Sequence, residues 1–168
     1  MRAPSTVLAV ALAAAGFAGA SRAADLSADC RPIVVAIEKS LHTDHSTVAS
    51  HGANTVHGVT VNGTTWLQMD GTWRKSPMTV EANIAMSREN LKAARSYACK
   101  ALPDSVVDGK PVAIWVTHTV VEDGTADSRV AIAKGSGLVV SVENWHAGET
   151  GPPDIVTRYD YANVKPPL

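Results

Sequence analysis

The sequence lacks the short motifs that mark most enzymes. It contains no Gly-x-Ser-x-Gly elbow, no glycine-rich phosphate loop, no His-Glu-x-x-His and no Cys-x-x-Cys. Serine, histidine and aspartate are all present, but their proximity cannot be read from a single sequence. The chain is therefore predicted not to be an enzyme and to carry no cofactor.

Long hydrophobic runs are also scarce, and the one run lies at the N-terminus between Val7 and Ala20. A membrane-spanning helix needs about 20 apolar residues, and this run is shorter and is followed by the small-x-small site Ser21-Arg22-Ala23. This pattern predicts a secretory signal over residues 1–23, which is removed on export to the periplasm. Cys30 lies well past the run, so lipid attachment at that residue is not expected.

No basic patch or acidic tail is present. Removal of residues 1–23 leaves 13 basic and 16 acidic side chains, a formal charge of −3, and the basic residues are scattered. Binding to a nucleic acid would require clustered lysine and arginine side chains, so no nucleic-acid partner is expected. Residues 24–168 are long enough for a single domain with a real core, which we expect to be a monomer.

The sequence has two cysteines, Cys30 and Cys99. An even number of cysteines in an exported chain usually forms disulfides, so these two are predicted to pair and close a loop of about 70 residues. Two buried free thiols are the alternative. A catalytic cysteine has less support, since no feature marks either thiol as activated.

Residues 109–145 hold three apolar, β-branched runs separated by two turn signals, Glu122-Asp123-Gly124-Thr125 and Gly135-Ser136-Gly137. They predict a three-stranded antiparallel meander. In the first run the even-numbered residues share one face and Trp115, Thr117 and Thr119 share the other. We expect the even-numbered face to lie beneath the helices, next to the sides that carry Val130, Ile132, Val140 and Val142.

Two helices are expected. Apolar residues recur at helical spacing in residues 30–42, with Pro32 in the first turn and Ser27 or Asp29 as a candidate cap. A second helix is predicted over residues 87–102, ending before Pro103, while residues 79–86 are ambiguous. Cys99 would lie on this second helix, so the disulfide would join the two helices, or a helix and a neighbouring strand.

Residues 46–70 follow a period of two, and Asn62-Gly63 predicts a tight hairpin. Its register pairs Val61 with Thr64 and Val59 with Trp66. Both faces of the hairpin are half apolar, which indicates that something covers or binds the second face. Asp70-Gly71 turns into a short strand at residues 72–75, and a last strand is expected over residues 155–164.

The order of these elements resembles that of the LolA/LppX-like superfamily of exported lipoprotein and lipid carriers. The motifs that carry the likeness are Asp70-Gly71-Thr72-Trp73, Asp108-Gly109-Lys110-Pro111-Val112, Ser136-Gly137-Leu138 and Tyr159-Asp160-Tyr161-Ala162-Asn163-Val164. The resemblance implies an α+β fold with a strongly curved antiparallel sheet, an incomplete β-barrel, and two main helices packed on its concave side over an apolar cavity. The strand at residues 130–134 departs from the pattern because it lacks an aromatic residue.

Six residues are the candidates for lining such a cavity: Ile114, Val116, His118, Val140, Trp66 and Met69. His118 is either an ordinary core histidine or a polar anchor for a ligand, and the tryptophan and methionine are either lining or core. The group His42, Asp44 and His45 does not have the spacing of a zinc site, so no metal is expected.

Two functions remain open from the sequence. One is a periplasmic carrier for an apolar ligand, a lipid or the acyl chains of a lipoprotein, with transient membrane contact. The other is a non-catalytic envelope interaction or structural protein whose core is filled.

Overall fold

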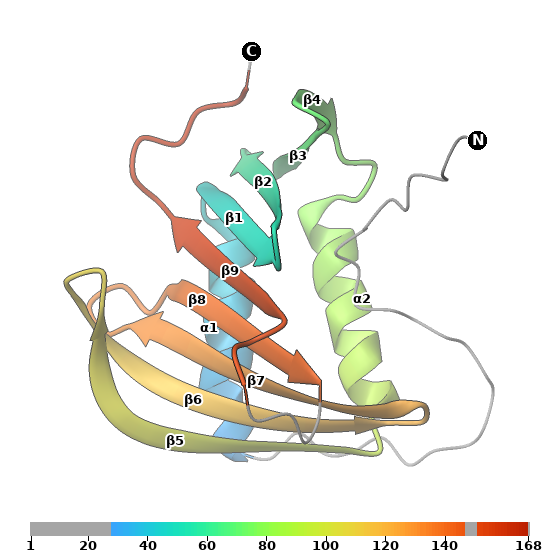
Figure 1. The fold of residues 1–168 in the computed structure, drawn as a ribbon, viewed down its shortest axis with the longest axis vertical. Coiled ribbons are helices and arrows are strands. Elements are labelled where there is room, and N and C mark those ends of the chain that lie inside the picture. Colours follow the sequence, from blue (N-terminus) through green and yellow to red (C-terminus); the bar gives the residue numbers. More distant parts are fainter. Residues whose placement is uncertain (1–27, 147–150, 168) are drawn as a thin grey trace.

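The computed structural model describes residues 28–146 and 151–167. Most of them form one nine-stranded antiparallel sheet with the strand order β4-β3-β2-β1-β9-β8-β7-β6-β5 (Figure 1). The predicted signal peptide lies outside the described residues. The strands are β1 His45–His51, β2 Asn54–Val61, β3 Thr64–Met69, β4 Thr72–Lys75, β5 Ser96–Val107, β6 Lys110–Val121, β7 Gly124–Ala133, β8 Val139–His146 and β9 Ile155–Asp160.

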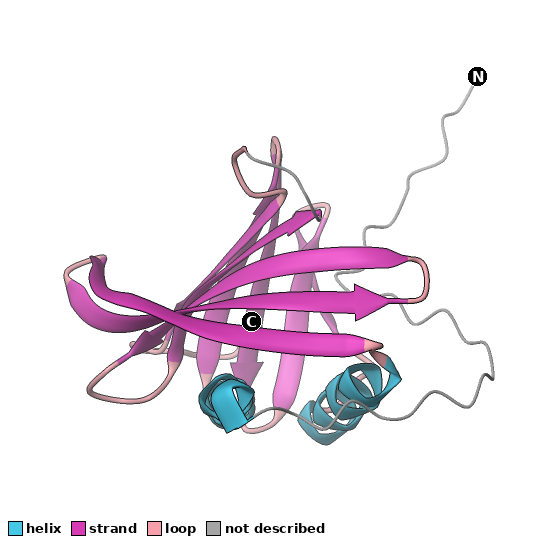
Figure 2. Cartoon of the chain, turned by 90° about the horizontal axis from the view of Figure 1, so that it is seen from below, coloured by secondary structure: helices cyan, strands magenta, loops and turns pink. Residues whose placement is uncertain are grey.

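A short 3-10 turn, η1 Ala28–Cys30, leads into α1 Arg31–His42, and α2 Val80–Ala93 follows β4. Both α-helices lie on the same side of the open, curved sheet (Figure 2), so the predicted α+β class is confirmed. The side chains of Glu38 and Arg88 join the two helices through two hydrogen bonds of 2.8 and 2.9 Å. No helix of the described residues is long and apolar enough to cross a membrane.

The first helix agrees with the prediction, but the second was placed too late in the chain. It begins after Thr79, whose Oγ1 accepts a hydrogen bond from the Ala82 N–H at 3.1 Å, and it ends at Ala93. The predicted helix over residues 96–102 is wrong, because these residues belong to β5 and pair with β6. The alanine-rich segment has helical propensity, but its backbone groups are taken by the long β6 ladder, and tertiary context overrides propensity.

The disulfide between Cys30 and Cys99 is confirmed, with the two α-carbons 5.1 Å apart. Because Cys99 lies on β5, the bond attaches the start of α1 to a strand rather than to the second helix. It therefore holds η1 and α1 against the edge of the sheet.

The Asn62-Gly63 hairpin is confirmed with the predicted register, since Val61 pairs with Thr64 and Val59 with Trp66. Asn62 and Gly63 have φ values of 49° and 72°, which are the positive values that a two-residue type I′ turn requires. The Asn62 N–H also donates to the Asp44 carboxylate at 2.8 Å.

The meander is confirmed as β6, β7 and β8, but its facing was predicted wrongly. Trp115 pairs with Val130, and both belong to the cluster that packs on Ile33 and Ala36 of α1. Because the two-residue turn at Glu122-Asp123 pairs even-numbered residues of β6 with odd-numbered residues of β7, the even-numbered side of β6 faces away from the helices. We call the two sides of the sheet the helix-facing face and the helix-free face.

A β-bulge in β8 divides the residues that were expected to share one side. The register shifts between Ala131 and Ile132, so Val139 and Val142 pack with α1 while Val140 packs on the helix-free face. The Val139 N–H donates to Ser40 Oγ at 2.9 Å, and its carbonyl accepts from the Tyr161 hydroxyl at 2.7 Å. These two hydrogen bonds satisfy the backbone where the ladder is interrupted.

Candidate functional site

A groove of about 540 Å³ lies on the helix-free face, across β5, β6, β7 and the end of β8. Its floor consists of two rows of cross-strand neighbours. In the first row His118 of β6 lies between Ala98 of β5 and Asp127 of β7, and in the second row Val116 lies between Lys100 and Arg129. Leu102 and Trp145 complete the apolar part of the lining. The groove thus combines an apolar floor with charged groups along its length.

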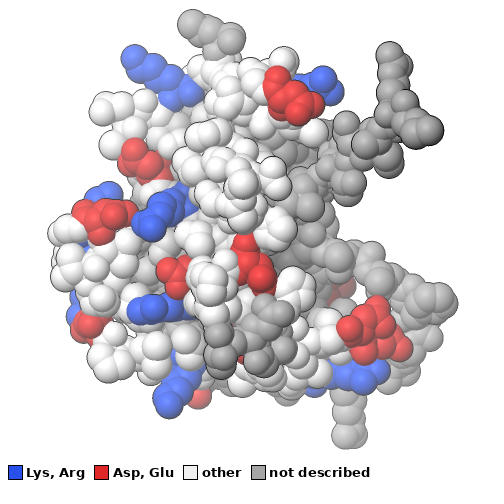
Figure 3. Space-filling model, viewed as in Figure 1, with Lys and Arg blue, Asp and Glu red and all other residues white. Residues whose placement is uncertain are grey.

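The charges of the groove are unevenly paired. His118 Nδ1 lies 2.6 Å from a carboxylate oxygen of Asp127. Arg129 reaches Glu143 only at 4.0 Å, and Lys100 has no ion-pair partner among the described residues. Figure 3 shows charges of both signs scattered over this side of the molecule.

The sheet curls over this face at one end. The turn between β5 and β6 reaches β9, where Arg158 contacts Asp108 at 3.3 Å, and Lys134 of the β7–β8 connection binds Asp104. The curl buries a second apolar cluster that no helix covers. Its members are Val112, Ile114, Ala131 and Val140, with Leu102, Val107 and Ala133 packed against them.

The structure brings together only part of the predicted site. Val116 and His118 line the groove, whereas Ile114 and Val140, 2% and 7% exposed, are core residues of the neighbouring cluster. Trp66 and Met69 lie far along the sheet order in β3 and, being an odd number of residues apart in one strand, point to opposite faces. Ligand binding by any of the six residues stays a prediction.

Sequence reasoning missed four groove residues: Lys100, Leu102, Asp127 and Arg129. The signal that could have found the β7 pair was the two-residue turn at Glu122-Asp123, which fixes the register and so places Asp127 opposite His118. The sequence places Lys100 and Leu102 in a helix, and only the pairing of β5 with β6 brings them to the groove.

Among the described residues, the hydrogen-bond partner of His118 is Asp127, and no hydroxyl or thiol is hydrogen-bonded to its ring. No three His, Cys, Asp or Glu side chains of the described residues gather closely enough to hold a metal ion. In the group His42, Asp44 and His45, whose spacing predicts no zinc site, His45 is buried and its Nδ1 lies 2.7 Å from the Thr43 carbonyl.

The class of fold is thus an open, curved antiparallel sheet with two helices on one side and a groove on the other. The sequence matches no protein-family model and none of the curated proteins. Several solved structures are nevertheless similar to it in fold.

Three structural neighbours illustrate the likeness. LprF from Mycobacterium bovis is 9% identical over 84% of this chain and 97% of that one, with a TM-score of 0.47. Lipoprotein LppX from Mycobacterium tuberculosis is 11% identical over 85% and 96%, with a TM-score of 0.43. MucB, solved in complex with MucA(peri), is 13% identical over 78% of this chain and 53% of that one, with a TM-score of 0.48. Identities this low concern the fold alone.

Proposed function

We propose that this protein is an exported, non-catalytic binding or carrier protein that holds an apolar ligand, such as an acyl chain of a lipid or lipoprotein, on the helix-free face. The observation that carries the proposal is the groove of about 540 Å³, a volume within the range of roughly 300–1,000 Å³ that is usual for small-molecule sites. The ligand was expected beneath the helices, but the space beneath α1 holds the packed side chains of Ile33, Ala36 and Val139.

Binding in the groove would come from burial of apolar surface. Val116, Leu102 and Trp145 supply the apolar contacts, which contribute about 25 cal/mol for each Å² removed from water. Lys100 and Arg129 flank Val116 and would fix the orientation of a ligand with an anionic end. His118, held by Asp127, is a further polar contact at the same site.

Export is part of the same proposal. The predicted signal at residues 1–23 directs the chain to the periplasm, and the Cys30–Cys99 bond fits a compartment in which disulfides persist. The protein would act there as a monomer.

The test is ligand recovery followed by direct binding. The protein purified from cells is extracted with organic solvent and analysed by mass spectrometry, and the stripped protein is titrated with a fluorescent fatty acid. Val116→Asp should abolish binding, because it places a charge on the apolar floor, whereas Val106→Asp, at a β5 position that is 65% exposed, should leave binding unchanged. No extractable lipid and no fatty-acid binding would refute the proposal.

His118→Leu separates anchoring from folding. The histidine side chain is 51% exposed, so its loss should leave the free energy of unfolding within about 0.5 kcal/mol. Affinity for a ligand with a carboxylate head should fall if the imidazole contacts that head, while affinity for a neutral alcohol of equal chain length should not. Equal effects on both ligands would show that His118 is no head-group contact.

A second candidate is a non-catalytic envelope interaction protein without a small ligand. The packing of α1 on the sheet favours it, since Ile33 and Val139 are 0% and 1% exposed and leave no room beneath that helix. Capture of the same partner by the wild type and by Val116→Asp, with no lipid found in either, would support this candidate over the first.

A further inference from the structure

The far edge of the sheet carries an apolar surface that the groove does not explain. We call residues 64–79, which comprise β3, β4 and the loop before α2, the edge hairpin. In Figure 1 it lies at one end of the long axis of the molecule, and β4 is the last strand of the sheet, paired only with β3. The outer edge of β4 is therefore unpaired within the described residues.

Strand register places apolar side chains on both faces of the edge hairpin. Gln68 pairs with Trp73 and Trp66 with Lys75, so the two tryptophans are diagonal neighbours on the helix-free face. Leu67 is on the opposite face, where it remains 37% exposed. In the loop that follows, Met78 is 38% exposed. Trp66 and Trp73 are half-buried, so Leu67 and Met78 are the exposed large apolar groups here, and such groups gathered at one end of a molecule are typical of an interaction site.

The charges of the edge hairpin are of one main sign. It contains two basic side chains, Arg74 and Lys75, against one acidic residue, Asp70, although the whole chain is net negative. Neither Arg74 nor Lys75 forms an ion pair with any described residue, and both side chains are exposed. These positive charges are thus free to contact a negative surface.

A hollow lies beside Lys75. It has a volume of about 400 Å³ and is lined by Lys75, by Met78 and by four hydroxyl residues, Thr64, Thr65, Ser76 and Thr79. One cation surrounded by hydroxyl groups is chemistry that suits a phosphate oxygen, since the lysine provides charge and the hydroxyls provide donors.

We propose that the edge hairpin is a docking surface for an anionic phospholipid bilayer. Tryptophan side chains settle at the boundary between acyl chains and head groups, where one end of the ring is apolar and the other is wet. Basic residues beside them are attracted to the negative surface potential of anionic lipids. A protein surface is the alternative occupant, because tryptophan, methionine and arginine are enriched at protein interfaces, and the absence of vesicle binding would favour it.

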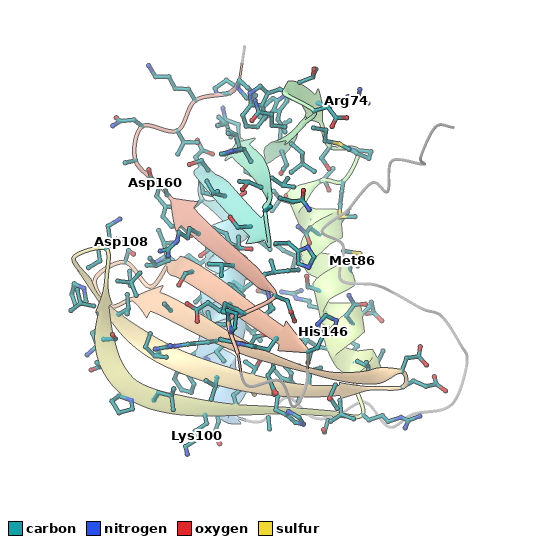
Figure 4. All side chains as sticks on the ribbon, viewed as in Figure 1. Arg74, Met86, Lys100, Asp108, His146 and Asp160 are labelled. Carbon is teal, nitrogen blue, oxygen red and sulfur yellow. A yellow bond between two sulfur atoms is a disulfide. The ribbon has the colours of Figure 1, made fainter. Side chains whose placement is uncertain are left out.

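The position of the edge hairpin leaves the groove open during docking. Figure 4 shows Arg74 at one end of the molecule and Lys100, which lines the groove, at the other. A protein bound to a bilayer through the edge hairpin would therefore keep its groove in solution. The docking surface stands on its own observations and does not depend on what the groove binds.

The first experiment measures co-sedimentation of the mature protein with phosphatidylcholine vesicles that contain phosphatidylglycerol, and with vesicles of phosphatidylcholine alone. Binding should be stronger to the anionic vesicles and should weaken as salt is raised. Each base near such a surface is worth about 1 kcal/mol, so the double variant Arg74→Gln, Lys75→Gln should bind about 30-fold more weakly.

The matched control is Arg31→Gln, Lys110→Gln, which removes the same charge from exposed residues outside the edge hairpin and should bind nearly as the wild type does. Equal binding to neutral and anionic vesicles, no binding to either, or equal losses in the two double variants would overturn the proposal. Circular dichroism of each variant confirms that it is folded.

The second experiment tests the geometry of docking through quenching of tryptophan fluorescence by phosphatidylcholine brominated on its acyl chains, mixed with phosphatidylglycerol. Quenching should fall in Trp66→Phe and Trp73→Phe and persist in Trp145→Phe, whose side chain lies in the groove. Quenching that is lost only in Trp145→Phe would place the bilayer at the groove and contradict the edge hairpin. Free glycerol phosphate, which should not compete at concentrations equal to the lipid, distinguishes a bilayer site from a soluble phosphate site.

Discussion

His45 is a buried histidine at the junction of α1 and β1, 5% exposed, and its ring lies 5.6 Å from that of Tyr159 and 6.0 Å from that of Tyr161. Burial lowers the pKa of His45 below its usual value of 6.5, although the Thr43 carbonyl opposes part of the shift. Burial also raises the pKa of Tyr161 to about 12, so this cluster is neutral at physiological pH.

The lowered pKa of His45 predicts a loss of stability in mild acid. The unfolded chain takes up a proton at His45 near pH 6.5, before the folded chain does, so the free energy of unfolding is largest above pH 6.5 and declines as pH falls from 6.5 toward the folded pKa. Urea unfolding at several pH values should show a steeper decline for the wild type than for His45→Gln. Identical slopes would mean that His45 titrates alike in the folded and unfolded chains.

Ile33 illustrates how much one core side chain of α1 contributes to the free energy of unfolding. It is 0% exposed, whereas Val35 on the same helix is 58% exposed. Ile33→Ala should reduce the free energy of unfolding by about 2–5 kcal/mol, and Val35→Ala by about 0.5 kcal/mol or less, both measured by chemical denaturation. A similar loss in the two variants would show that α1 does not pack through this face.

At the scale of elements, β1 and β2 meet closely at Gly58. A Cβ added there would lie 2.5 Å from Thr47 Oγ1 and 3.5 Å from Leu67 Cδ2, closer to the hydroxyl than a real Cβ approaches. Gly58→Ala should therefore destabilise the sheet by about 1–3 kcal/mol, the usual cost of overpacking.

A double-mutant cycle tests whether contact with Thr47 causes the loss of stability in Gly58→Ala. Thr47→Ala removes the hydroxyl that a new Cβ would meet, so Gly58→Ala should cost clearly less in the Thr47→Ala background than in the wild type. Denaturant unfolding of the four proteins measures the coupling. Additive losses would indicate that backbone freedom, and not the contact with Thr47, makes glycine necessary.

The disulfide acts between elements that are distant in sequence. Cys30 and Cys99 are 69 residues apart. In the chain-entropy description, closing a loop of that length raises the free energy of the unfolded chain by about 4 kcal/mol, which stabilises the folded state by the same amount. Cys30→Ser, Cys99→Ser should lower the free energy of unfolding by up to that amount, and reducing agent should have no further effect on the variant. Mass spectrometry of the exported wild type should show the two cysteine peptides linked.

At the scale of the whole molecule, the sequence by itself determined most local elements. Alternation in residues 109–145, the Asn62-Gly63 turn and the apolar spacing of residues 30–42 each depend on neighbours in the chain, so β6 to β8, the β2–β3 hairpin and α1 agree with the prediction. The cysteine pair followed from the even count and the predicted export, and it too is confirmed.

Only the tertiary structure decided which face each strand presents. Residues 96–102 have helical propensity but form β5, because β6 offers a full ladder of backbone partners. The side of β6 that meets α1 depends on pairing across the turn at Glu122-Asp123 and on the bulge in β8. A shift of one residue turns every side chain of a strand to the other face, so His118 borders a groove on the helix-free face where a position beneath the helices was expected.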